Sequence, residues 1–210
     1  MNSPYQSHLF WGPFSPLVSL TGGGLLIMAS GRLAYAIVAA GALIWTCGFS
    51  ALIAFPCRRL FPKRGKNPVL VFLSAFTGSI YVLFLCLVSP ILGMETFFFV
   101  SLTPLLCIGS GLFERINSLE LGEAVFRALG EAAVLGGLII AFSLIREPLG
   151  YLSLSLPGGV YGIVKIFSSG EKTFLPVHIA AGSAGALLLL GYGMGLYRYF
   201  RNQRVPPENP

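Results

Sequence analysis

LAYAIVAAGALIWTCGFSALIAF, residues 33–55, contains no charged side chain. About 20 consecutive apolar residues are what a helix needs to cross the hydrocarbon core of a bilayer, which is roughly 30 Å thick. Short charged segments bound this stretch, and similar apolar runs recur along the chain. The stretch therefore predicts a transmembrane helix, and its pattern predicts the fold class of the whole protein.

Composition supports the same fold class for all 210 residues. Apolar residues make up 55% of the chain and charged residues 10%, whereas a soluble domain carries about 25% charged residues. So few polar groups cannot cover a globular surface in water. With about 20 residues for each span, the chain has room for about six spans and for no separate soluble domain. We therefore expect one all-α integral membrane domain over residues 1–210.

Six apolar segments are candidates for transmembrane helices. Prolines and glycines interrupt two of them: Pro13, Pro16 and three consecutive glycines in the first, and Pro104 in the fourth. The loop of about thirty residues between the fifth and sixth segments is expected to lie in the membrane interface or to fold back. The predicted spans are residues 8–30, 33–55, 69–92, 96–113, 122–145 and 176–200.

Basic residues predict the orientation of these spans. They gather in the loop after the second span (Arg58, Arg59, Lys63, Arg64 and Lys66) and in the C-terminal tail (Arg198, Arg201 and Arg204). Basic loops stay in the cytoplasm, and both groups do so only if the chain has six spans and a cytoplasmic N-terminus. We therefore predict a bacterial inner-membrane protein with both termini in the cytoplasm. The net charge of +6 then reflects topology, and no nucleic-acid partner is expected.

The interrupted segments also suggest an internal repeat. Residues 15–20, SPLVSL, resemble residues 103–108, TPLLCI, and both stretches run into glycines. Three spans in each half, about 5–92 and about 93–204, would give the halves opposite orientations. In such inverted repeats the broken helices meet near the midplane and form the functional site. Chance recurrence of Ser/Thr-Pro-Leu in apolar sequence is the alternative.

The chain has four cysteines, and no two of them have the C-x-x-C spacing that would indicate a zinc site or an iron–sulfur cluster held by this chain alone. Cys47 and Cys86 lie inside plain spans, where cysteine is usually a small apolar residue, and Cys57 borders the basic loop. Cys107 follows Pro104 by three residues and precedes two glycines, which would let the backbone approach a cofactor closely. Spacing leaves open whether Cys107 is a ligand or a packing residue.

Charged residues inside the fifth span form a second group of candidates. Glu123, Arg127 and Glu131 are spaced by four and so share one helix face. At about 1.5 Å per residue, Glu131 lies roughly 13 Å into the span, where charged groups face protein or water. They are either functional groups or an internally neutralised Arg127–Glu131 pair that docks against another subunit. Arg146 and Glu147 end the same helix and are expected to anchor it at the outer interface.

Two stretches in the second half resemble a known family. Residues 107–114, CIGSGLFE, look like its Cys-apolar-x-x-Gly-Arg-x-Glu segment, and residues 143–150, SLIREPLG, look like its Arg-Glu-apolar-Leu-Gly signature. The family comprises the RnfE/NqrD-type membrane proteins of the Rnf electron-transport complex and of the Na⁺-translocating NADH:quinone reductase, Nqr. The long loop after Glu147, with Pro176 opening the last span, favours this type over its homologous partner type, RnfA/NqrE.

The resemblance implies a six-helix subunit paired with a homologous subunit of opposite topology, within a complex of further Rnf/Nqr-like subunits. The pair would hold one [2Fe–2S] cluster in mid-membrane and pass electrons through it, coupled to Na⁺ or H⁺ transport. Cys107 falls on a cluster cysteine of the family, and Ser15 stands where the family has its other cysteine. Leu112 replaces an arginine and Arg127 an acidic residue. Either another residue completes the ligands, or the cluster is altered or absent, or the chain is a diverged paralogue.

The leading hypothesis for function is a subunit, not catalytic alone, of a redox-driven ion translocase. Its cofactor-binding candidates are Cys107, also the metal-ligand candidate, and the position of Ser15. Two alternatives stay open: a small secondary transporter or substrate-binding membrane component, and a structural subunit that has lost cluster binding.

Overall fold

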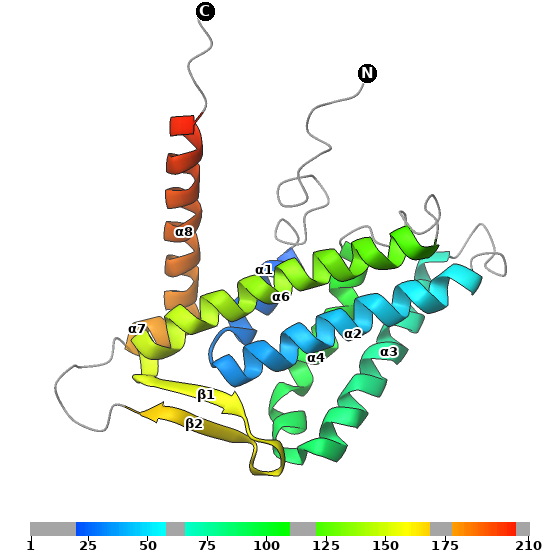
Figure 1. Cartoon of the computed structure of the whole chain (residues 1–210), viewed down its shortest axis with the longest axis horizontal. Coiled ribbons are helices and arrows are strands. Elements are labelled where there is room, and N and C mark those ends of the chain that lie inside the picture. Colours follow the sequence, from blue (N-terminus) through cyan, green and yellow to red (C-terminus); the bar gives the residue numbers. More distant parts are fainter. Residues whose placement is uncertain (1–19, 58–65, 110–120, 169–177, 205–210) are drawn as a thin grey trace, which may run out of the picture.

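The computed structural model describes residues 20–57, 66–109, 121–168 and 178–204. Helices dominate, and one β-hairpin lies at an end of the helical layer (Figure 1). In chain order the elements are α1 (Leu20–Ala29), α2 (Leu33–Cys57), α3 (Lys66–Val88), α4 (Pro90–Gly109), α6 (Leu121–Tyr151), β1 (Ser153–Pro157), η2 (Gly159–Tyr161), β2 (Ile163–Ser168), α7 (His178–Ala181) and α8 (Ser183–Arg204).

Three of these helices are long and apolar enough to cross a membrane: α2, α3 and α6. The apolar parts of α4 and α8, Pro90–Leu106 and Ser183–Gly193, are shorter. Many large apolar side chains point outward, including Phe72 and Leu87 of α3, as expected for helices surrounded by lipid. The chain is therefore a mainly helical, membrane-embedded protein. Within the described ranges it has three clear spans, where the sequence predicted six.

Small residues form the contact between α2 and α6, which lie side by side (Figure 1). A Cβ atom built on Gly136 of α6 would lie 2.9 Å from the Cβ of Ala40 in α2. In lipid no difference in hydrophobicity drives helices together, so close backbone approach through small residues supplies the attraction. The buried residues around this contact are mostly alanines, with a few larger side chains: Ala36, Ala39, Leu43, Ala51, Ala128, Ala132, Leu135 and Ile139.

The turn between α3 and α4 consists of Ser89 alone. Its N–H donates to the Leu85 carbonyl at 2.7 Å, and its carbonyl accepts from the N–H of Gly93 at 2.9 Å. A side chain on Gly93 would lie 3.1 Å from the Cα of Cys86, so this turn requires glycine there. The predicted third span thus ends at Val88 rather than 92. The fourth helix begins at Pro90 rather than 96, because proline suits the first position of a helix.

Helix α4 continues through Pro104 as far as Gly109. The expected interruption at Pro104 is therefore wrong. Proline lacks the N–H that would bond to the Val100 carbonyl four residues earlier. The Thr103 hydroxyl donates to that carbonyl instead, at 2.7 Å, and this bond lets the helix pass the proline.

The loop after α6 contains an antiparallel β-hairpin, β1–β2, which the sequence pattern did not lead us to expect. Its strand β1 contacts α2 and α6, and η2 at its tip contacts α4. The start of α2, the α3–α4 turn and the end of α6 all lie at this end of the molecule (Figure 1). We call it the hairpin end.

The last predicted span is divided in two. After α7 ends at Ala181, the N–H of Gly182 donates to the Ile179 carbonyl at 3.2 Å, and α8 starts at Ser183 and projects away from α2, α3 and α4 (Figure 1). Of the first predicted span, 8–30, only α1 lies within the described residues. Its prolines, and Ser15 with them, lie outside those residues.

Candidate functional site

Arg146, near the end of α6, is almost completely buried, with 3% of its surface exposed. Its Nε donates to the carbonyl of Ala180 at 2.9 Å, and one Nη donates to that of Gly182 at 3.0 Å. The other Nη donates to the carbonyl of Ile27 at 2.6 Å and to the hydroxyl of Ser30 at 2.8 Å. The carbonyls of Ile27 and Ala180 lie in the last turns of α1 and α7, where helix carbonyls lack a partner within the helix and favour a positive charge. The Gly182 carbonyl also accepts from the N–H of Ala186 in the first turn of α8, at 3.1 Å.

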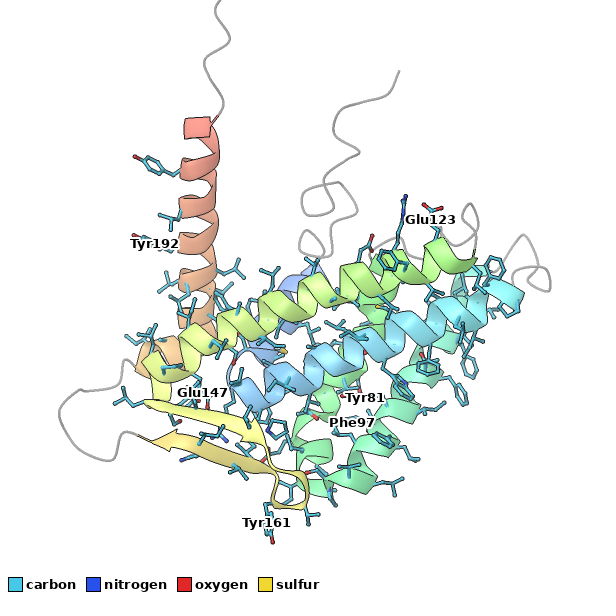
Figure 2. The ribbon with its side chains drawn as sticks, in the orientation of Figure 1. Tyr81, Phe97, Glu123, Glu147, Tyr161 and Tyr192 are labelled. Carbon is cyan, nitrogen blue, oxygen red and sulfur yellow. The ribbon has the colours of Figure 1, made fainter. Side chains whose placement is uncertain are left out.

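Glu147, the next residue, holds the start of another helix. Its Oε2 accepts a hydrogen bond from the backbone N–H of Leu33, the first residue of α2, at 2.7 Å, and the residue is only 1% exposed. A carboxylate at a helix N-terminus satisfies an unpaired N–H and matches the positive end of the helix dipole. Adjacent residues of α6 therefore fasten α1, α2 and α7 together (Figure 2). We call Arg146 and Glu147 the junction pair.

Beside the junction pair lies a cluster of charged and aromatic side chains. The Tyr35 hydroxyl donates to Glu95 at 2.9 Å. The Arg32 guanidinium lies 5.9 Å from the ring centre of Tyr35 and 5.6 Å from that of Tyr151, which are cation–π distances. Glu95 was not among the residues singled out from the sequence. Its signal was available, because an acidic residue inside an apolar stretch is a functional candidate by default.

The charged residues on one face of α6 form a different ion pair from the predicted Arg127–Glu131 pair. Glu123 and Arg127 form an ion pair of 2.8 Å, and both side chains are about half exposed (Figure 2 labels Glu123). Glu131, two turns further along from Glu123, is buried. The described ion pair of Arg127 is thus with the earlier glutamate, and such exposed pairs contribute little to stability.

Two pairs of buried hydroxyl groups connect α2 with α3 and α4. Because the Thr103 hydroxyl donates to the Val100 carbonyl, the Thr46 hydroxyl must donate in the 3.2 Å bond between Thr46 and Thr103. By the same reasoning Ser50 donates to Thr77 at 3.0 Å, since Thr77 donates to the carbonyl of Ser74. Hydrogen bonds between such side chains hold membrane helices together.

We expect Thr103→Val to destabilise the protein by about 1 kcal/mol, the usual scale of one interhelical hydrogen bond in a membrane protein. The substitution keeps the shape but removes the group that accepts from Thr46 and donates to Val100. Thermal unfolding in detergent measures the loss. Ser101→Ala is the control, because Ser101 is exposed and bonds only within its own helix, to Phe97. Equal melting temperatures for the two variants would contradict a special role for Thr103.

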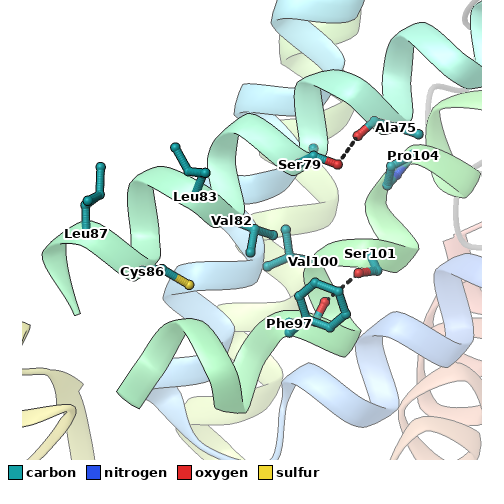
Figure 3. A pocket seen from close by; sticks show the side chains of 11 residues that line it. Ala75, Ser79, Val82, Leu83, Cys86, Leu87, Phe97, Val100, Ser101 and Pro104 are labelled. Carbon is teal, nitrogen blue, oxygen red and sulfur yellow. Dashed lines mark hydrogen bonds between the residues drawn. The ribbon is translucent and has the colours of Figure 1, made fainter. Parts of the chain in front are cut away.

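An open apolar groove of roughly 570 Å³ runs between α3 and α4, beside Pro104 (Figure 3). Gly78 lies in its wall, where an added Cβ would be 3.2 Å from the Cγ of Pro104. Cys86 and Val82 line it from α3, and Phe97 from α4. Its apolar lining suits lipid chains or apolar partners and offers no charged group for catalysis.

The predicted cluster ligands are only partly described. Ser15 lies outside the described residues, and Cys107 lies in the last turn of α4, where the backbone but not the side chain is described. Cys47 is buried and Cys86 half-buried. Among the described side chains, no group of three His, Cys, Asp or Glu residues is arranged to hold a metal ion.

Comparison with known proteins adds no relative. No protein-family model and no curated protein matches this chain.

Proposed function

We propose that this chain is a membrane subunit of an ion-translocating electron-transport complex of the Rnf/Nqr kind. The junction pair is the observation that carries the proposal. Arg146 and Glu147 belong to the 143–150 segment that resembles the family's Arg-Glu signature. The same two side chains are buried and fasten three other helices. The two residues of the resembling segment therefore have a structural role in this chain, and this role supports the proposal.

The directions of the helices favour the predicted topology. The start of α2, the end of α3, the start of α4 and the end of α6 share the hairpin end, so neighbouring helices alternate in direction. Lys66 begins α3 at the opposite end, next to the predicted cytoplasmic basic loop. We therefore propose that the hairpin end faces outward from the cytoplasm of a bacterial inner membrane, with both termini inside, and that the fold is a six-helix inverted repeat.

The proposed partner is a homologous six-helix subunit of opposite topology, within a complex of further Rnf/Nqr-like subunits. Large apolar side chains exposed on α3 and α4, among them Phe76, Phe84 and Phe98, give such a subunit an apolar surface to pack against. Cys107, in the last turn of α4, is the proposed ligand of a [2Fe–2S] cluster shared between the two subunits. A thiolate there would hold iron, whereas the hydroxyl of Ser15 is a poor ligand for it.

Iron content of the purified complex tests the proposal. We expect Cys107→Ala to lose the cluster's iron and its EPR signal in the reduced state, because iron–sulfur clusters are bound through cysteine thiolates. Cys86→Ala is the matched control, since Cys86 lies in an ordinary turn of α3 and lines an apolar groove. If Cys107→Ala retains full iron, Cys107 is not a ligand. If the wild-type complex contains no iron, cluster binding is excluded and a purely structural subunit is favoured.

A small secondary transporter is the second candidate, favoured by the buried hydroxyl pairs. Thr46, Ser50, Thr77 and Thr103 place polar oxygens between three apolar helices, and polar groups inside a membrane often mark a transport path. Thermal stabilisation of the isolated, iron-free chain by a small solute would support this function. Co-purification with flavin-carrying or ferredoxin-like subunits would count against it.

A further inference from the structure

The β-hairpin shows the reverse of the side-chain pattern of a water-exposed hairpin. Along β1, Ser153 and Ser155 are buried against the helix ends, while Leu156 is exposed. Its cross-strand neighbour Val164 is exposed as well, and Ile166 is 65% exposed. An antiparallel hairpin in water normally turns its apolar face to the protein and its polar face outward. Here serines face the protein and aliphatic side chains face away from it.

The tip of the hairpin extends this apolar surface. Val160 and Tyr161 of η2 are 71% and 85% exposed, and Tyr161 points away from the helices (Figure 2). Gly162 lies against α4, where an added Cβ would be 3.0 Å from Ile91. Ile91 and Met94 are themselves exposed on the outside of α4. The tip therefore continues the apolar outer surface of a helix that is embedded in the membrane.

The composition of this surface fits the boundary between headgroups and acyl chains. Tyrosine concentrates at that depth, because its ring is apolar and its hydroxyl is polar. Lys165 is exposed between Val164 and Ile166, and a lysine can bury its stem while its ammonium reaches a phosphate. The hairpin follows α6 after a single residue, Leu152, so it begins at the level where the helix ends.

We infer that the hairpin is a lipid-binding element, with the face that carries Leu156, Val164 and Ile166 inserted among the lipids at the hairpin end. The tip residues Val160 and Tyr161 lie in the same layer. The hairpin thereby anchors the ends of α2, α4 and α6 at one membrane surface. The inference depends on the membrane-embedded fold and not on electron transport, so it stands or falls separately from the proposed function.

Single-tryptophan variants of the full chain test it in phosphatidylcholine vesicles, with Trp11 and Trp45 replaced by phenylalanine. We expect the fluorescence of Ile166→Trp to be strongly reduced by lipids brominated on their acyl chains and little affected by iodide in the water. Val160→Trp, at the tip, should also respond to the brominated lipids. Glu123→Trp is the control, because Glu123 lies in the first turn of α6, at the end opposite the hairpin, and its side chain is about half exposed. It should respond less to the lipids and more to iodide.

Two results would overturn the inference. Quenching of Ile166→Trp and Val160→Trp by iodide but not by brominated lipids would place the hairpin in water. Protection of both tryptophans from both quenchers would mean that protein covers the face, as in an interface with a second copy of the chain. Circular dichroism of each variant shows whether its helices have formed, and a variant that lacks them is replaced by Leu156→Trp, which carries the probe on the same face.

Discussion

Arg146→Ala is expected to destabilise the protein by about 3–5 kcal/mol. It removes four hydrogen bonds whose donor is charged, each typically worth about 1.5–3 kcal/mol, and such losses are not simply additive. The alanine would leave the carbonyls of Ile27, Ala180 and Gly182 without the guanidinium that now binds them. We expect low yields of folded protein and early separation of α1 and α7 from α6.

Arg127→Ala is the matched control on the same helix. Its partner Glu123 is one turn away and both side chains are about half exposed, so the expected loss is about 0.3–0.5 kcal/mol, typical of an exposed pair within one helix. Thermal unfolding in detergent compares the two variants, and limited proteolysis shows whether the α7 region is released first. Equal losses of stability in the two variants would refute a structural role for the junction pair.

Gly136→Leu is expected to disrupt the contact between α2 and α6. The first added carbon would already lie 2.9 Å from the Cβ of Ala40 and 3.3 Å from its Cα, so the helices must move apart. Overpacking usually costs about 1–3 kcal/mol, and leucine at a contact between two backbones should lie at the upper end of that range. Gly136→Ala should have a smaller effect in the same direction.

The neighbouring glycine provides the control. A Cβ on Gly137 would meet no atom within 4 Å and the residue is exposed, so the side chain of Gly137→Leu is expected to point away from α2. The substitution should raise stability slightly, because glycine is about 0.5–1 kcal/mol less favourable than alanine within a helix. The melting temperatures of the two leucine variants should therefore move in opposite directions. A fall of equal size in both would show that α2 and α6 do not approach each other at Gly136.

Hydropathy predicted α2 well, because charged residues mark both of its ends. Arg32 precedes it and Arg58 follows it, and the helix extends to Cys57 where 55 was expected. The border between α3 and α4 has no such marks. No charged residue occurs from 67 to 94, so a turn of one residue within apolar sequence is invisible to composition. Only Pro90 and Gly93 indicated it.

The uninterrupted α4 shows the limit of reading proline as a helix breaker. Pro104 does remove a backbone hydrogen bond, but Thr103 restores a partner to the Val100 carbonyl. The sequence contains this threonine, yet the direction of its hydroxyl depends on the fold. The hairpin was missed for a different reason. The alternation of serine and leucine over 153–156 is a strand pattern, but it stands in a loop that was expected only to lie in the membrane interface or to fold back.

The sequence predicted two residues of the candidate site, Arg146 and Glu147, but not the groups that these residues contact. Arg146 and Glu147 stood out as charges at a span end, and we expected an interfacial anchor. They are instead buried, and burial is possible because backbone groups at helix ends satisfy most of their hydrogen bonds. Every residue has a backbone N–H or carbonyl, so the sequence does not indicate which of these groups will be the partners. Glu95 was overlooked as a charge in an apolar stretch. Its contact with Tyr35 could not be predicted, because Tyr35 lies 60 positions earlier and no local pattern links the two residues.

The one-residue turn at Ser89 also constrains how the protein is made. With α3 and α4 joined so closely, and with Lys66 and Glu95 as their only charged residues, neither helix can leave the translocon far ahead of the other. The two should partition into lipid together, as one hairpin that carries almost no charge across the bilayer. The α3–α4 unit would then pack as one piece against α2, which is synthesised earlier, through the buried hydroxyl pairs. The junction pair would close the assembly last, once the chain has been synthesised as far as Gly182, whose carbonyl Arg146 binds.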